Sequence, residues 1–169
     1  MLCIKSEVPY VKSKRNFINR FKKDHNYNYE SLNENSKKEC IEVAREWCER
    51  KNCAMEGSAI KELTACEIAL LNMEELGLKG GAIRTDGKIV AFSLGEKIND
   101  ETVIVHFEKA DTEYNGIFQV INNEFIKNDW SDTIYVNREE DMGIEGLRKA
   151  KMSYMPEFML ESYEVCENN

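Results

Sequence analysis

The sequence of 169 residues lacks several features that define large classes of protein. Its uncharged apolar runs are short, far below the ~20 residues that a membrane-spanning helix needs. No apolar block of signal-peptide length precedes the first charges, so we expect neither a transmembrane segment nor secretion, and a cytoplasmic location. Prolines number only two, and no stretch rich in Pro, Gly or Ser divides the chain. We therefore expect a folded domain, neither secreted nor embedded in a membrane.

Cysteine is present but not in the spacing of a metal site. The six residues are Cys3, Cys40, Cys48, Cys53, Cys66 and Cys166. No CxxC pair occurs, and no second pair or histidine stands at zinc-site spacing. We therefore expect no metal, and reduced thiols that act as small apolar residues.

The chain does contain enough apolar material for a core. Its composition is 42% hydrophobic, with seven Phe, seven Tyr and two Trp. A length of 169 residues suits one domain, since domains typically hold on the order of 100–150 residues. A disordered chain is excluded on the same grounds.

Charge is distributed unevenly. Residues 1–23 carry seven Lys and Arg against one acid, which is +6, so the overall charge of −8 leaves −14 for the remainder. We treat residues 1–30 as a basic N-terminal arm and residues 31–169 as the domain. The cations of the arm are Lys12, Lys14, Arg15, Arg20, Lys22 and Lys23.

These cations alternate with Phe17, Ile18 and Phe21, which form a narrow apolar stripe on a helix. One interpretation is a docking helix with a solvated basic rim. The other is a surface for an anionic partner, either tRNA or a lipid headgroup, because clustered positive charge attracts anions regardless of sequence.

Apolar periodicity predicts the order of elements. Helical spacing predicts helices at residues 36–51, 58–76, 116–128 and 143–154. Alternation predicts strands at residues 82–85, 88–94, 102–109, 133–136 and 158–165. Ser36 and Glu39 have capping-box spacing, and residues 26–35 have the composition of a polar turn. Asp86-Gly87 is a strong hairpin signal, so the first three strands form an antiparallel meander.

This order resembles the GNAT (acyl-CoA N-acyltransferase) fold, an α+β class. The resemblance implies a mixed central sheet with helices on both faces. It also implies that strands 103–109 and 133–137 run parallel and splay apart to leave a cleft.

Two groups of residues could carry chemistry at that cleft. Strand alternation places Val103, Val105 and Phe107 on one side and His106 and Glu108 on the other. A histidine beside a carboxylate is suited to general-base catalysis, because the carboxylate fixes the tautomer. A structural surface pair is the alternative.

The second group follows the cleft-lining strand. Asn137 ends that strand, and Arg148, Lys151 and Tyr154 follow at spacings of three. Tyr154 could act as a general acid, while Asn137, Arg148 and Lys151 could bind the anionic part of a substrate. The alternative is a solvated basic helix face that complements the helix dipole.

A specific family is indicated by KSKRNFINRFKK, NMEELGLKGGAIR, DGKIVAFSLGE, VHFEKAD and YVNREEDMGIEGLRKAKMSYMP. These segments resemble an uncharacterised bacterial family related to the C-terminal catalytic domain of phosphatidylglycerol lysyltransferase. Members contain two tandem GNAT-like domains related to Fem aminoacyltransferases, and this sequence matches the second. The resemblance implies aminoacyl transfer from aminoacyl-tRNA to an amine or lipid hydroxyl.

One departure concerns the donor. GNAT enzymes that use acetyl-CoA place a Q/R-x-x-G-x-G/A turn before the crossover helix, where backbone amides bind pyrophosphate. Here the junction reads EKADTEYNGIFQ, with a single glycine and two acids. Acetyl-CoA is therefore disfavoured, and aminoacyl-tRNA is the donor that the resemblance implies.

Three hypotheses follow from these features. The first is a transferase of the aminoacyl-transferring type, in which His106 and Glu108 help to deprotonate the acceptor. The second is an acyl-CoA-dependent N-acyltransferase with a degenerate pyrophosphate loop. The third is a non-catalytic module, left from a two-domain protein, that forms a homodimer through an exposed apolar patch.

Overall fold

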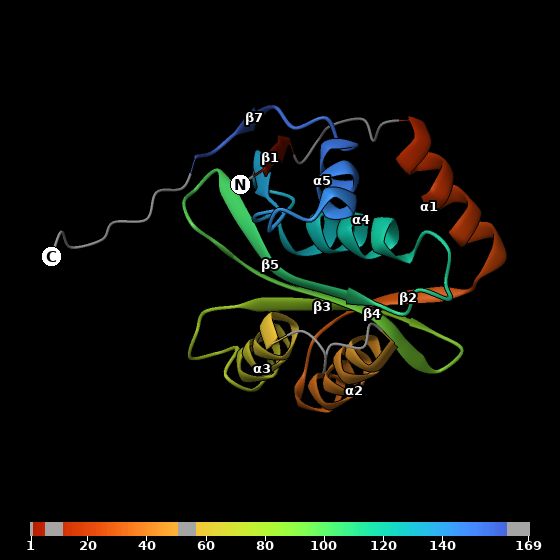
Figure 1. The fold of residues 1–169 in the computed structure, drawn as a ribbon. Coiled ribbons are helices and arrows are strands. Elements are labelled where there is room, and N and C mark those ends of the chain that lie inside the picture. Colours follow the sequence, from red (N-terminus) through yellow and green to blue (C-terminus); the bar gives the residue numbers. More distant parts are fainter. Residues whose placement is uncertain (1, 6–11, 51–56, 162–169) are drawn as a thin grey trace, which may run out of the picture.

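The computed structural model describes residues 2–5, 12–50 and 57–161 (Figure 1). The strands of this part are β1 Leu2–Lys5, β2 Tyr27–Ser31, β3 Lys79–Thr85, β4 Lys88–Lys97, β5 Thr102–Ala110, β6 Tyr135–Asn137 and β7 Phe158–Met159. Its helices are α1 Lys12–Asp24, α2 Glu34–Arg50, α3 Gly57–Leu71, α4 Ile117–Asp129 and α5 Glu145–Met152. Within the described ranges, the strands form one sheet in the order β2-β3-β4-β5-β6-β1-β7.

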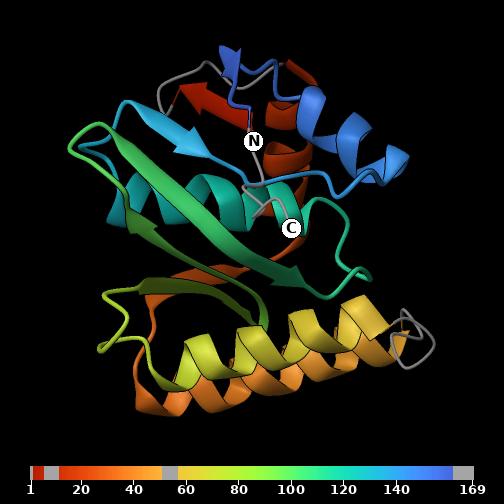
Figure 2. The same cartoon turned by 60° about the vertical axis from the view of Figure 1, so that its left-hand side comes forward.

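Helices cover both faces of this sheet. α2 and α3 lie side by side on one face, and α1 and α4 lie on the other (Figures 1 and 2). Phe92 and Leu94 of β4 pack with α2 and α3 in one core cluster. Ile18 and Phe21 of α1 pack with α4 in a second. The predicted α+β class, with a mixed sheet between helical layers, is confirmed.

The strand directions also follow the prediction. β3, β4 and β5 form an antiparallel meander, and the hairpin turn at Asp86 and Gly87 has the positive φ angles of 50° and 79° that Gly favours. β5 and β6 are parallel, but they pair only over residues 102–104 and 135–137. Beyond Ile104 the two strands separate, as Figure 2 shows.

The N-terminal region contains structure that the sequence pattern did not predict. Residues 27–31, expected within a polar turn, form strand β2, which pairs antiparallel with β3 along its whole length. β1 pairs with β6 and β7. Short strands at a sheet edge carry no long apolar run, so periodicity does not reveal them. β2 pairs with β3, and α1 packs against α4, so both contact later parts of the chain. The division into an arm of residues 1–30 and a domain of residues 31–169 stays a prediction.

The start of α2 differs from the predicted capping box. Asn33, not Ser36, is the capping residue, because its Oδ1 accepts hydrogen bonds from the backbone N–H groups of Asn35 (2.9 Å) and Ser36 (3.2 Å). The Ser36 Oγ atom in turn accepts a hydrogen bond from the backbone N–H of Asn33 at 2.7 Å. The reciprocal arrangement exists, but one helical turn earlier than predicted.

Differences at the other elements are smaller. α3 ends at Leu71 rather than near residue 76, and α5 is shorter than predicted at both ends. The last predicted strand is present at Phe158–Met159, and its residues from 162 onward lie outside the described part. Cys40, Cys48 and Cys66 are buried, as expected of apolar thiols. Burial raises the pKa of the Cys66 thiol to about 12, so it is unreactive.

A close approach at Gly95 gives a stability prediction. An added Cβ at Gly95 would lie 2.4 Å from the backbone oxygen of Ile104 on the neighbouring strand. Gly95→Ala should therefore lower the free energy of unfolding by about 1–3 kcal/mol, because the backbones must separate. Urea titration monitored by circular dichroism measures this difference.

Gly146→Ala is the matched control. Nothing lies within 4 Å of an added Cβ at Gly146, which is exposed within α5. This substitution should raise stability slightly, because alanine favours a helix by ~1 kcal/mol over glycine. Equal unfolding midpoints for the Gly95→Ala variant and wild type would contradict the prediction.

Candidate functional site

A cavity lies where β5 and β6 separate. Its volume is about 580 Å³, and α5, the start of α4 and α1 close its sides. The lining residues that carry a charge or a hydroxyl are Lys14, Glu62, His106, Glu108, Arg138, Glu139, Glu140, Lys151 and Tyr154. Apolar side chains such as Phe107 and Phe118 complete the wall. The sequence therefore brings distant segments to one site.

A β-bulge at His106 determines which side chains reach the cavity. Val105 pairs with Gly95 and Phe107 with Leu94, which leaves His106 as the extra residue. Val105 accordingly packs with α4, whereas Phe107 packs in the cluster of α2 and α3. The predicted alternation, with Val105 and Phe107 on one side, is wrong because the bulge reverses the strand's faces.

His106 is held between two carboxylates. Its Nδ1 lies 3.0 Å from Glu139 Oε1, and its Nε2 lies 2.9 Å from Glu96 Oε1. The hydrogen bond with Glu139 and the second carboxylate at Glu96 raise the pKa of the ring, against the effect of burial. Both ring nitrogens can donate at once only in the imidazolium form. The partners of His106 are thus Glu96 and Glu139, and not Glu108 as expected.

Glu139 depends on a strained turn that Asn137 maintains. Glu139 has φ of 59°, which is uncommon for a residue with a side chain. The Oδ1 atom of Asn137, which is 1% exposed, accepts a hydrogen bond from the Glu139 backbone N–H at 2.9 Å. Asn137 does not line the cavity; it positions the turn that carries Glu139.

Glu108 forms a partly buried ion pair with Arg138. The Arg138 Nη2 donates to Glu108 Oε1 at 2.8 Å, and each side chain is 11% exposed. Asn122 of α4 donates to the other oxygen of Glu108 at 3.1 Å. Glu108 lies at the cavity, as predicted, but its carboxylate fixes Arg138. Arg138 is not among the predicted site residues, because a single arginine after a strand belongs to no recognisable motif.

Tyr154 is the aromatic residue of the cavity wall that two cations contact. It is 8% exposed, and burial raises the pKa of its hydroxyl. The Nζ of Lys14 lies 4.5 Å from the ring centroid, and the guanidinium carbon of Arg138 lies 4.6 Å from it. Two cations therefore share one aromatic ring.

The two predicted cations of α5 have different positions. Lys151 lines the cavity, where its Nζ donates to the backbone oxygens of Arg138 and Glu140 at 2.5 Å each. Arg148 is absent from the lining, is exposed and binds Asp141 at 2.5 Å. The pair that the sequence suggested is thus divided between the cavity and the surface.

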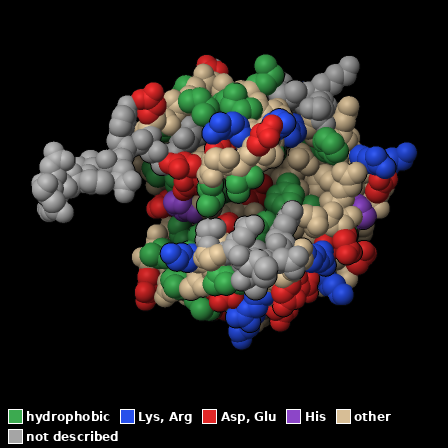
Figure 3. Space-filling view, in the orientation of Figure 1, with side chains coloured by type: hydrophobic (Ala, Val, Ile, Leu, Met, Phe, Trp, Pro, Cys, Tyr) green, Lys and Arg blue, Asp and Glu red, His purple; other side chains and the backbone are tan. Residues whose placement is uncertain are grey.

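The basic segment of α1 is also divided. Lys14 is buried at the cavity, Lys22 contacts Glu124 at 3.2 Å, and Arg20 contacts Asp24 at 3.5 Å. Arg15 and Lys23 are exposed, and for Lys12 only the backbone is described. Acidic and basic side chains are interspersed on the face seen in Figure 3. No helix in the described ranges combines the length and apolarity needed to cross a bilayer.

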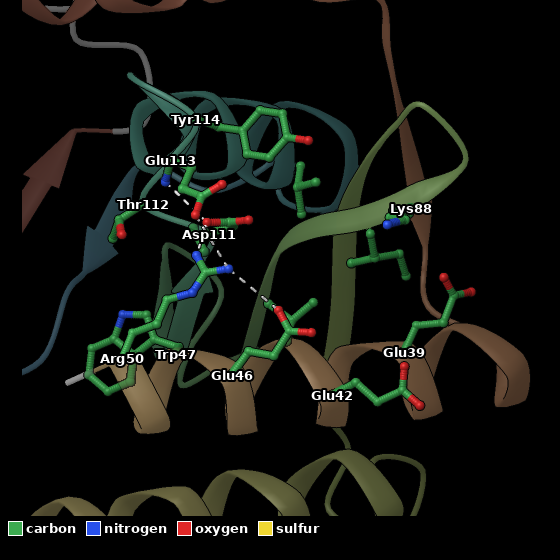
Figure 4. Close-up of a pocket in the computed structure, with 14 residues that line it drawn as sticks. Glu39, Glu42, Glu46, Trp47, Arg50, Lys88, Asp111, Thr112, Glu113 and Tyr114 are labelled. Carbon is green, nitrogen blue, oxygen red and sulfur yellow. Dashed lines mark hydrogen bonds and ion pairs between the residues drawn. The ribbon is translucent and has the colours of Figure 1, made fainter. Parts of the chain in front are cut away.

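A second pocket, of about 560 Å³, lies on the opposite face between α2 and the loop after β5. Its lining includes the acids Glu39, Glu42, Glu46, Asp111 and Glu113, as Figure 4 shows. Arg50 extends from α2 to Asp111 and Glu113 and ties the helix to the loop. No histidine lines this pocket, and its arginine is used in the contact between α2 and the loop. The first cavity is therefore the better candidate site.

The junction between β5 and α4 does not fit a pyrophosphate group. The backbone N–H groups of Ile117 and Gln119 already donate to the carbonyls of Tyr114 and Gly116, each at 3.1 Å. The backbone oxygen of Phe17 in α1 lies 3.0 Å from the position of a Cβ at Gly116, so α1 occupies this junction. Asp111 and Glu113 lie nearby in the sequence, and their negative charge also disfavours the phosphates of coenzyme A.

Comparison with known families identifies the domain. The family model described as phosphatidylglycerol lysyltransferase, C-terminal, matches residues 9–166. The chain belongs to this family.

Solved structures agree on the fold. A protein of unknown function from Bacteroides thetaiotaomicron is 42% identical, with a TM-score of 0.88 over 94% of this chain and 56% of that chain. The C-terminal domain of a protein named lysylphosphatidylglycerol synthetase from Agrobacterium fabrum is 14% identical, with a TM-score of 0.64 over 92% and 56%. The ribosomal-protein-alanine N-acetyltransferase of Brucella melitensis is 14% identical, with a TM-score of 0.53 over 85% and 100%. The GNAT-like fold is thereby confirmed.

Sequence relatives cover less of the chain. An uncharacterized protein of Mycoplasmoides gallisepticum is 27% identical over 93 residues, which is 55% of this chain and 30% of that protein. The chain thus spans about half the length of the Bacteroides protein and under a third of the Mycoplasmoides one. Activities of the longer proteins do not transfer directly to the domain.

The contacts of His106 give a prediction for pH dependence. Because Glu139 and Glu96 raise its pKa above the ordinary value of 6.5, the folded chain holds the imidazolium proton more tightly than the unfolded chain. This stabilisation is complete below the unfolded-state pKa and is lost as pH rises through the folded-state pKa. The difference in unfolding free energy between wild type and His106→Asn should therefore be largest below about pH 6.5 and should shrink as the pH rises above that value.

Urea titration across that range measures the difference. NMR of the ring protons tests the cause, since His25 is the chain's second histidine and His25→Asn assigns the remaining signal to His106. A titration midpoint for His106 at or below 6.5 would contradict the prediction.

Proposed function

We propose that the domain transfers an aminoacyl group from aminoacyl-tRNA to an amine or a lipid hydroxyl. The observation that carries the proposal is His106, held between Glu96 and Glu139 at the wall of the cavity where β5 and β6 separate. Membership in the phosphatidylglycerol lysyltransferase C-terminal family supports this class of reaction. The poor fit of the α4 junction to pyrophosphate supports a donor other than acetyl-CoA.

The proposed reaction is acyl transfer. The acceptor nitrogen or oxygen forms a bond to the ester carbonyl carbon, and the bond from that carbon to the ribose oxygen breaks. The acceptor loses one proton and the ribose oxygen gains one, so proton transfer between them completes the balance. One side chain with an ordinary pKa near neutral pH is sufficient for this transfer, because it can accept the proton from the acceptor and then donate it to the ribose oxygen.

His106 is the proposed proton-transfer group. Imidazole is the side chain whose ordinary pKa lies nearest to neutral pH, which suits it to accept and donate a proton, and Glu139 fixes its orientation. Displacement of one carboxylate contact by substrate would free a ring nitrogen for the acceptor. Tyr154, which burial keeps protonated, is proposed to orient the carbonyl, while Glu108 contributes by holding Arg138.

A transfer assay tests the proposal. Purified protein is incubated with radiolabelled lysyl-tRNA and either phosphatidylglycerol vesicles or a primary amine, and label in the acceptor is counted. We expect transfer by wild type and a loss of about 10²–10⁴-fold in His106→Asn, the usual contribution of a general acid or base.

The control is His25→Asn, because His25 contacts the rings of Phe21 and Tyr114 at the end of α1, away from the cavity lining. It should transfer at the wild-type rate. An equal rate for His106→Asn would remove the assigned role. Acetyl transfer from acetyl-CoA by a wild-type protein that leaves lysyl-tRNA intact would replace the proposal with an N-acyltransferase.

A further inference from the structure

Lys14 is an uncompensated cation inside the protein. The residue is 8% exposed, although it belongs to a helix whose other described cations are exposed. Its side chain lines the cavity and lies over the ring of Tyr154. In the described part of the chain, its Nζ makes no hydrogen bond or ion pair. A buried ammonium without an anion is costly, so its retention points to a partner that enters the cavity.

Two further cations converge on the same place. Arg138 shares the ring of Tyr154 with Lys14, and the Nζ of Lys151 is held by two backbone carbonyls, with no carboxylate of the described residues in an ion pair with it. Burial, together with the charge of Arg138, lowers the pKa of both lysines. Like charges gathered in this way repel one another, and the ion pair with Glu108 offsets only the charge of Arg138.

The carboxylates of the cavity have other partners. Glu62 binds Lys109 at 2.5 Å, Glu108 binds Arg138, and Glu139 binds His106. The backbone oxygen of Glu140 holds Lys151. None of these interactions pairs a carboxylate with Lys14, so the ammonium group at the ring of Tyr154 keeps its positive charge without a counter-ion from these acids.

We propose that Lys14, Arg138 and Lys151 form the binding site for a phosphate group. Three donors that approach from α1, the segment after β6 and α5 suit the several oxygens of a tetrahedral anion better than the two of a carboxylate. The cavity of about 580 Å³ exceeds a phosphate, and its apolar wall receives the remainder of the ligand. The inference concerns binding alone and holds whether or not the domain transfers an aminoacyl group.

Isothermal titration calorimetry tests this site with three probes: inorganic phosphate, AMP and glycerophosphoglycerol. We expect Lys14→Met to weaken binding of the phosphate probes about tenfold or more, because it removes one charge-assisted hydrogen bond. Methionine keeps the chain length that packs on Tyr154. Lys151→Met should weaken binding as well.

The matched control is Lys38→Met, which removes an exposed lysine from α2 on the opposite face of the sheet. It should bind as wild type does. Unfolding in urea should show Lys14→Met to be at least as stable as wild type, because a buried charge is removed. Weak binding in that variant then reflects the site and not the fold.

The probes also separate the source of the phosphate. Tighter binding of AMP than of glycerophosphoglycerol assigns the site to a nucleotide, and the reverse order assigns it to a lipid headgroup. Both results support the inference when Lys14→Met abolishes them. No binding of any probe by wild type, or equal binding by wild type and Lys14→Met, overturns it.

Discussion

Strand β5 has different partners on its two sides, and the rest of the site follows from this constraint. It pairs with β4 along almost its whole length, but with β6 over three residues only. From Val105 onward, one edge of β5 has no strand of the described residues beside it, so side chains and other segments surround this space. The cavity lies in this space, and α5, the start of α4 and Lys14 of α1 line it.

The bulge at His106 adds the chemistry to that opening. It reverses the faces of β5 just where β6 departs, so Glu108 contacts Asn122 on the α4 side and Lys109 contacts Glu62 of α3. His106 then lies between Glu96 of the neighbouring strand and Glu139 beyond β6. The glycine at position 95 permits the close approach of backbones that the bulge requires.

Much of the architecture was predictable because it depends on local patterns. The main helices, the meander and the turn at Asp86 and Gly87 appear where periodicity and turn chemistry place them. The short strands β1 and β2 were missed, since they are stabilised by neighbours rather than by their own apolar pattern. Asn33 caps α2 instead of Ser36, because the helix begins at Glu34, soon after β2 ends at Ser31 and about one turn earlier than predicted.

The candidate site was only partly predictable, and the reason is physical. The sequence by itself determined the fold class, the family, and the presence of His106, Glu108, Tyr154 and Lys151 near one cleft. Only the tertiary structure decided that His106 contacts Glu96 and Glu139, that Arg148 lies outside, and that Lys14 lies inside. Ion pairs and ring contacts join residues far apart in the chain, and one extra residue in a strand reverses its faces, so spacing cannot specify them.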